Sequence, residues 1–192
     1  MKLILSESQF QNLVSNTIEE IAVQRKDIVG KGAYHMIYPS KQFPDRIYKI
    51  GDPEIVKRWY SVFVEHPHLF PEVYKKGLTK VTLPNGHQEM KAYVMIEKLN
   101  VVKFKNFWDV IDKISREKEN MPLQLRVSAY EEGHRGYWNR MASYIDKDKE
   151  LLRLYNEFIM LMDSVYEIFP SADLHKLNFG YDKKNNLKCL DI

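Results

Sequence analysis

The chain has 192 residues, 44% of them hydrophobic, which is enough to bury a full core as one large domain or two small lobes. Its 29 basic and 26 acidic residues leave a net charge of only +3, so charge gives no reason to expect a nucleic-acid partner. The single cysteine excludes an internal disulfide framework, and no apolar run is long enough to span a bilayer, so we expect a cytoplasmic protein with no membrane partner.

The first predicted element is an amphipathic helix. Ser6 and Gln9 form a capping box, and the apolar residues after them recur at helical spacing. Residues 27–38 then predict a strand, a turn with Gly30 and Gly32, and a second strand. Glycines in such a turn let backbone N–H groups approach a phosphate without a Cβ in the way. The apolar helix positions are Phe10, Leu13, Val14, Ile18 and Ile21.

A strand with one embedded lysine, Lys49, is predicted next over residues 46–50. Asp52 as N-cap and Pro53 in the first turn are a helix start signal. This helix should end near the His-Pro pair at residues 66–67. Its apolar positions are Val56, Trp59, Tyr60 and Phe63.

Two further strands are predicted over residues 71–77 and 90–99, joined by a Pro-Asn-Gly turn at residues 84–86. The second strand is an apolar run that ends in charged residues. An ordinary buried strand explains this pattern, so by itself it carries no function.

The second half of the chain is predicted to be helical. An apolar stripe over residues 104–118 indicates one helix, and a wider stripe over residues 149–169 indicates a buried core helix that Pro170 ends. Between them, residues 126–144 interleave aromatic and arginine side chains. That pattern is typical either of a surface that anchors a partner or of a helix with Trp138 buried and its arginines in solvent.

The last twenty residues carry a pattern typical of a site for Mg²⁺ and phosphate. Asn178 follows Asp173 by five positions, and an apolar strand leads to Asp191. The polar residues 182–186 predict a hairpin turn that returns Asp191 to the level of Asn178. Mg²⁺ is usually bound by one or two protein carboxylates together with substrate phosphates, so this set of oxygen ligands is sufficient. The remaining Asp173 can then meet a hydroxyl nucleophile.

In this order, the Gly-x-Gly turn, the strand with Lys49, the Asp-x-x-x-x-Asn loop and the final Asp resemble the protein-kinase-like fold. The motif Asp-Leu-His-x-x-Asn at residues 173–178 is similar to that of aminoglycoside phosphotransferases and other minimal bacterial or phage kinase-like proteins. The resemblance implies an α+β, bilobal fold. It has a small antiparallel-sheet N-lobe and hinge over residues 1–99, and a reduced helical C-lobe over residues 100–192.

The same resemblance implies that ATP and Mg²⁺ are the cofactors. One lysine grips the α- and β-phosphates beside the glycine turn, an Asn and an Asp bind the metal, and a second Asp acts as base with a lysine near the γ-phosphate. The implied residues are Gly30, Gly32 and Lys49 for phosphate, Asn178 and Asp191 for metal, and Asp173 and Lys176 for catalysis, with His175 as the alternative to Lys176 near the γ-phosphate.

Two further roles follow from the resemblance. In the family, the helix after the lysine strand carries a Glu that pairs with the lysine, and Glu54 is the candidate here. It sits near the first turn, where the helix dipole already explains an acidic residue. The apolar strand resembles the hinge that crosses between lobes, so Ile96 borders the adenine pocket and the backbone from Glu97 to Leu99 meets the adenine edge.

Three functions remain open from the sequence. A phosphotransferase acting on a hydroxyl of an unidentified protein or small-molecule acceptor is favoured by the retained polar groups, because a scaffold has no chemical need for all of them. A pseudokinase-type protein-binding module is favoured by the lack of an activation segment after Asp191. Adenylyl transfer by a flipped nucleotide is the third. If the protein is phage-encoded, it acts in the host cytoplasm.

Overall fold

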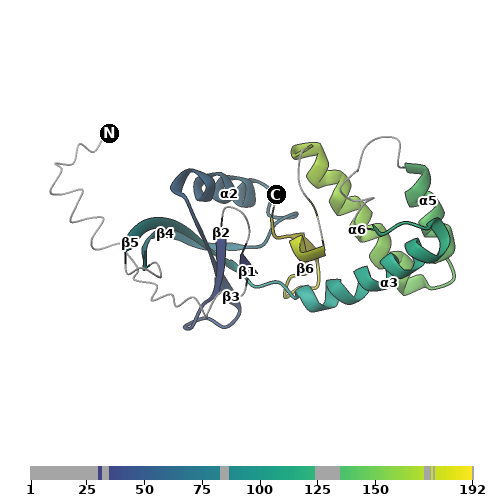
Figure 1. The fold of residues 1–192 in the computed structure, drawn as a ribbon, viewed down its shortest axis with the longest axis horizontal. Coiled ribbons are helices and arrows are strands. Elements are labelled where there is room, and N and C mark those ends of the chain that lie inside the picture. Colours follow the sequence, from purple (N-terminus) through teal and green to yellow (C-terminus); the bar gives the residue numbers. More distant parts are fainter. Residues whose placement is uncertain are drawn as a thin grey trace. The chain divides into compact units, whose positions relative to one another are not determined.

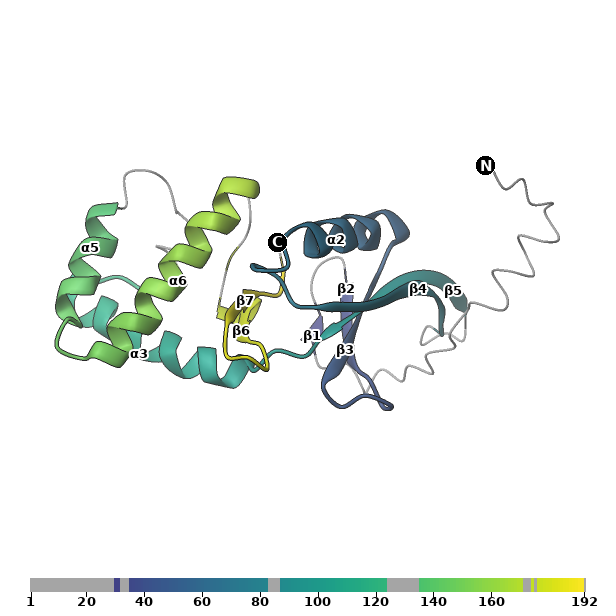
Figure 2. The same cartoon turned by 180° about the vertical axis from the view of Figure 1, so that it is seen from behind.

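The computed structural model describes residues 30–31, 35–82, 87–123, 135–170, 174 and 176–191. The chain divides into two compact units, whose elements are labelled in Figure 1 and seen from behind in Figure 2. The first unit contains the described residues up to Pro67 together with Glu72–Lys98, and the second contains His68–Pro71 and the described residues from Leu99 onward. The predicted amphipathic helix after Ser6 and the turn at residues 84–86 lie outside the described residues.

The first unit is built on an antiparallel sheet of five strands in the order β1-β2-β3-β5-β4. One helix, α2, connects β3 to β4 and packs on β3, β4 and β5 (Figure 1). The elements are β1 (Gly30–Lys31), β2 (His35–Pro39), β3 (Arg46–Gly51), α2 (Pro53–Glu65), β4 (Val73–Thr82) and β5 (Gln88–Glu97).

The central strands β3 and β5 carry buried side chains on both faces of the sheet. Successive side chains of a strand alternate between faces, so Tyr48 and Ile50 share the face opposite to Lys49. Tyr48 and Tyr93 meet there edge to face, with ring centroids 5.5 Å apart. That face forms a hydrophobic cluster of Tyr38, Tyr48, Ile50, Val81, Tyr93 and Met95. Lys49 is therefore on the other face of β3, the one on which α2 packs.

Helix α2 begins and ends where the sequence predicts. It runs from Pro53, directly after its N-cap Asp52, to Glu65, directly before the His66-Pro67 pair. A residue before a proline is disfavoured in the helical conformation, which explains the end of the helix. The buried residues of α2 are Val56, Trp59, Val62 and Phe63.

The second unit is mainly helical. Asn100 and Asp148 cap two of its helices, because their side-chain oxygens accept hydrogen bonds from Lys103 N and Leu151 N, at 3.1 and 3.0 Å. The elements are α3 (Val101–Glu119), α5 (Arg135–Tyr144), α6 (Lys149–Ile168), the 3₁₀ turn η3 (Lys176–Asn178), β6 (Phe179–Tyr181) and β7 (Leu187–Cys189). Their core is aromatic and contains Phe104, Phe107, Trp108, Trp138, Phe158 and Phe179. The α+β class predicted from the sequence is confirmed.

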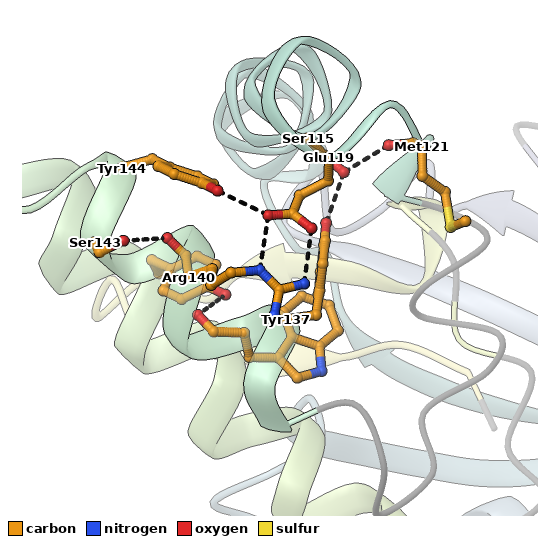
Figure 3. A network of polar contacts seen from close by, with 9 residues as sticks. Ser115, Glu119, Met121, Tyr137, Arg140, Ser143 and Tyr144 are labelled. Carbon is orange, nitrogen blue, oxygen red and sulfur yellow. Dashed lines mark hydrogen bonds and ion pairs between the residues drawn. The ribbon is translucent and has the colours of Figure 1, made fainter.

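A polar network joins the end of α3 to α5 (Figure 3). The Glu119 carboxylate accepts two hydrogen bonds from the Arg140 guanidinium, at 3.0 and 2.8 Å, and one from the Tyr144 hydroxyl at 2.8 Å. Nearby, the hydroxyls of Ser115 and Tyr137 lie 2.7 Å apart and are buried. In the segment 126–144, the side chains of Tyr137, Arg140 and Tyr144 thus make these contacts within the second unit.

No described helix combines the length and the continuous apolar surface that crossing a bilayer requires.

Candidate functional site

Lys49 lies in the middle of β3 and is wholly buried. Its neighbours in the sheet are Ile37 on β2 and Val94 on β5. Its ammonium nitrogen lies 4.0 Å from the centre of the Trp59 ring and 5.7 Å from that of Phe63. A buried charge is costly unless nearby groups compensate it, and the face of an indole ring attracts a cation. The predicted phosphate-binding lysine is therefore held against two aromatic rings of α2.

The sequence prediction missed Trp59, which it treated only as an apolar position of the helix. Trp59 and Phe63 are four residues apart, so they lie on the same face of α2. Glu54, the predicted acidic partner of Lys49, is exposed in the first turn of that helix. The spacing of apolar residues assigned Trp59 to the buried face, but it did not indicate that a charged group lies opposite.

The glycine turn is described only in part. Gly30 is in β1, where it pairs with Ile37 of β2, and Lys31 pairs with Met36. This pairing confirms two antiparallel strands here, but Gly30 lies in the first strand and not in the predicted turn. Gly32 lies outside the described residues.

The end of β5 is buried. Ile96 has no exposed surface, and Glu97 and Leu99 are each 5% exposed. The backbone N–H of Glu97 donates to the Glu72 carbonyl and that of Lys98 donates to the Asp45 carbonyl, both at 2.9 Å. These two N–H groups are therefore bonded within the first unit, and an adenine edge along the backbone from Glu97 to Leu99 stays a prediction.

In the second unit, the hairpin of β6 and β7 returns the backbone next to Asp191 to the level of Asn178. Asn178 is buried at the end of η3, directly before β6. Beyond β7, the backbone N–H of Leu190 donates to the Asn178 carbonyl at 2.6 Å. Since Asp191 is the next residue, it lies beside Asn178, as the predicted hairpin requires.

The turn of this hairpin is held by the side chain of Asp182. One carboxylate oxygen of Asp182 accepts from the backbone N–H groups of Lys184 and Asn186, at 2.9 and 2.8 Å. The other accepts from the side-chain amide of Asn186 at 3.0 Å. Asn185 has a φ of 67°, a left-handed conformation that asparagine tolerates better than most residues. The polar residues therefore form the turn by local hydrogen bonds.

Both edges of the hairpin are bonded to other segments of the same unit. On the β6 side, Tyr181 and Asn100 exchange backbone hydrogen bonds of 2.8 and 3.3 Å, beside the start of α3 (Figure 2). On the β7 side, the Cys189 N–H donates to the Leu69 carbonyl at 2.8 Å, and the Lys188 ammonium donates to the His68 carbonyl at 2.9 Å. An isolated two-stranded hairpin is only marginally stable, so these bonds hold Asn178 and Asp191 in place.

The side chain of Tyr181 is buried in this region and uncharged. It is 2% exposed, and its hydroxyl makes no hydrogen bond with any residue that the structure describes. Burial, together with the negative charge of Glu157, raises the pKa of Tyr181 to about 12. The Lys103 ammonium lies 4.4 Å from the centre of its ring. Tyr181 therefore stays protonated near neutral pH and packs as an uncharged ring.

We expect Gly180→Ala to destabilise the protein by about 1–3 kcal/mol, because a methyl group would overfill a packed position. A Cβ at Gly180 would lie 2.7 Å from Leu99 Cβ and 3.3 Å from the Asn100 carbonyl carbon. Urea denaturation measures the change. Gly136→Ala is the matched control, since its Cβ would meet only the Arg140 guanidinium at 3.6 Å. This control should be neutral or stabilising, and equal losses in both variants would contradict the close approach at Gly180.

The predicted catalytic loop is described at Leu174 and from Lys176 onward. Asp173 and His175 lie outside the described residues. Leu174 is wholly buried, and Lys176 is half-buried in η3. The position of Lys176 two residues before Asn178 keeps it on the same short turn as one predicted metal ligand.

Among the residues that the structure describes, no group of three or more His, Cys, Asp or Glu side chains is arranged to hold a metal ion. The pair of Asn178 and Asp191 offers one amide and one carboxylate. That number fits Mg²⁺ bound to a nucleotide, because phosphate oxygens and water complete its octahedron. It does not fit a Zn²⁺ site, which needs three or four protein ligands.

No protein-family model matches this chain, and no curated protein matches it in sequence.

Proposed function

We propose that this protein is an ATP- and Mg²⁺-dependent phosphotransferase of the kinase-like fold, which moves the γ-phosphate to a hydroxyl on a protein or small-molecule acceptor. The observation that carries the proposal is the bond from Leu190 N–H to the Asn178 carbonyl, which sets Asp191 beside Asn178. We propose that the side chains of these two residues supply oxygen ligands for the metal there, directly after the Asp-x-x-x-x-Asn loop. Because the proposed reaction uses ATP, we also propose that the protein acts in the cytoplasm.

The chemistry requires mainly positioning and neutralisation of charge. In phosphoryl transfer, metal ions and cationic side chains stabilise the phosphate oxygens, and a carboxylate orients the attacking hydroxyl. Asn178 and Asp191 supply the protein ligands for Mg²⁺. Lys49 supplies the cation for the α- and β-phosphates. Asp173 supplies the carboxylate for the acceptor hydroxyl, with Lys176 beside the γ-phosphate.

The order of elements supports the same proposal. An antiparallel sheet carries Lys49 on β3, and the helix that follows, α2, packs against the lysine. The chain then leaves β5 for a helical unit, in which Pro170 follows the long helix α6 and precedes Asp173. The hairpin and Asp191 come last. This is the sequence of parts that a minimal kinase-like protein uses.

Transfer of label from ATP tests the proposal. The full chain is incubated with Mg²⁺ and ATP labelled at either the α or the γ position, alone and with panels of hydroxyl-bearing peptides and aminoglycosides. We expect the γ label to reach an acceptor, the α label to stay on the nucleotide, and EDTA to abolish transfer. Transfer of the α label would replace the proposal with adenylyl transfer. Binding of Mg²⁺–ATP with no transfer of either label would replace it with a protein-binding module.

A further inference from the structure

The contact between Lys49 and Trp59 joins two rigid elements. Lys49 is fixed in the sheet by pairing with both β2 and β5. Trp59 is 4% exposed, and α2 is held on the sheet by its buried face. At the start of α2, the Lys91 ammonium on β5 donates to the Asp52 carboxylate at 2.7 Å, and this hydrogen bond raises the pKa of Lys91. The ammonium of Lys49 and the indole ring therefore meet at a defined place.

We propose that Trp59 is a positioning residue for Lys49, whose ring holds the ammonium where it meets the nucleotide phosphates. A lysine is a point charge on a flexible four-carbon stem, so its reach has to be restricted if it is to bind one group of oxygens. A ring face attracts the cation without taking its proton or adding a negative charge. The proposed effect on nucleotide binding rests on the phosphotransferase function, whereas the contact itself does not.

Phe63 extends the same surface. It follows Trp59 by one helical turn, and its ring centre lies 5.7 Å from the Lys49 ammonium, compared with 4.0 Å for Trp59. Both distances are within the range in which a ring attracts a cation. The shorter distance, and the stronger attraction of an indole, assign the main effect to Trp59.

The test compares ATP with adenosine, which has no phosphate for Lys49 to bind. Calorimetry of the full chain in Mg²⁺ should show that Trp59→Leu weakens ATP binding about 2- to 30-fold, the range of a cation–π contact, with adenosine affinity unchanged. Trp59→Phe keeps a ring and should retain most of the affinity. Val56→Ala is the control for damage to the buried face of α2, because Val56 is 3% exposed and has no ring. It should leave the ratio of the two affinities unchanged.

A double-mutant cycle separates positioning from a merely structural role. If Trp59 acts through Lys49, Trp59→Leu should have no further effect on ATP binding when Lys49→Met is already present. An additive effect in the double variant would overturn the proposal. An equal loss of ATP and adenosine affinity in Trp59→Leu would overturn it too.

The contact between Lys49 and Trp59 can be tested without nucleotide, by a measurement that needs no substitution of Trp59. The chain has three tryptophans, and Trp59 is the one that precedes residue 100, so 5-fluorotryptophan labelling gives three ¹⁹F signals. Lys49→Met should shift the Trp59 signal and leave those of Trp108 and Trp138 in place. No shift would overturn the contact. If the signal shifts but the wild-type chain binds no ATP, the phosphotransferase function fails and Trp59 remains the residue that holds Lys49.

Discussion

Asp173→Asn should lower phosphoryl transfer by about 10²–10⁴-fold, the usual contribution of a positioned acid–base group, while the affinity for Mg²⁺–ATP stays close to that of the parent. Asparagine keeps the shape of the side chain and removes the carboxylate that we propose orients the acceptor hydroxyl. The reason is the place of Asp173 at the head of the Asp-x-x-x-x-Asn loop. Single-turnover release of γ-labelled phosphate measures the rate, and calorimetry measures the binding.

Asp191→Ala is the matched contrast, because it changes a carboxylate at the other end of the same pattern. It removes the proposed Mg²⁺ ligand that follows Leu190 in the chain, so the stabilisation that Mg²⁺–ATP gives to the folded protein should fall. Asp173→Asn should retain that stabilisation. If both variants bind Mg²⁺–ATP as the parent does, and the parent transfers no phosphate, the catalytic function is excluded and the binding module remains.

Lys49→Met should abolish most of the increase in melting temperature that ATP causes. At an ATP concentration 100 times the Kd, binding adds about 2.7 kcal/mol to the free energy of unfolding, which is about 5–10 °C for a protein of this size. Without nucleotide, the melting temperature should not fall. Methionine fills a similar volume and is flexible enough to pack in the same place, against the rings of Trp59 and Phe63.

Lys76→Met is the control for this substitution. The Lys76 ammonium lies 3.6 Å from the centre of the Tyr60 ring, so this variant also removes a lysine that contacts an aromatic ring of α2. Lys76 is exposed, and we assign it no role in nucleotide binding. It should keep the full response to ATP. Unfolding of Lys49→Met in the absence of nucleotide would instead make Lys49 a structural residue.

Features that depend on neighbouring residues could be predicted from the sequence. Asp52 and Pro53 predicted the start of α2, and the following His-Pro pair predicted its end, because capping and proline sterics act within a few residues. Asp182 and the polar residues after it predicted the turn that returns Asp191 to Asn178. The candidate site could also be proposed from the residue types Asp, Asn and Lys, because the ability to bind a metal ion or a phosphate belongs to the side chains themselves.

Features that depend on distant residues were decided only by the tertiary structure. Asp52 was predicted as a helix cap, yet its carboxylate pairs with Lys91 on β5 and makes no side-chain capping bond. Periodicity placed Trp59 on the buried face of α2, but only the packing of α2 on β3 set Lys49 opposite its ring. Gly180 carries no signal in the sequence, and the need for glycine arises from the approach of Leu99. A local pattern determines which face of an element is buried, whereas the partner on that face is set by chain segments that only the packed structure brings together.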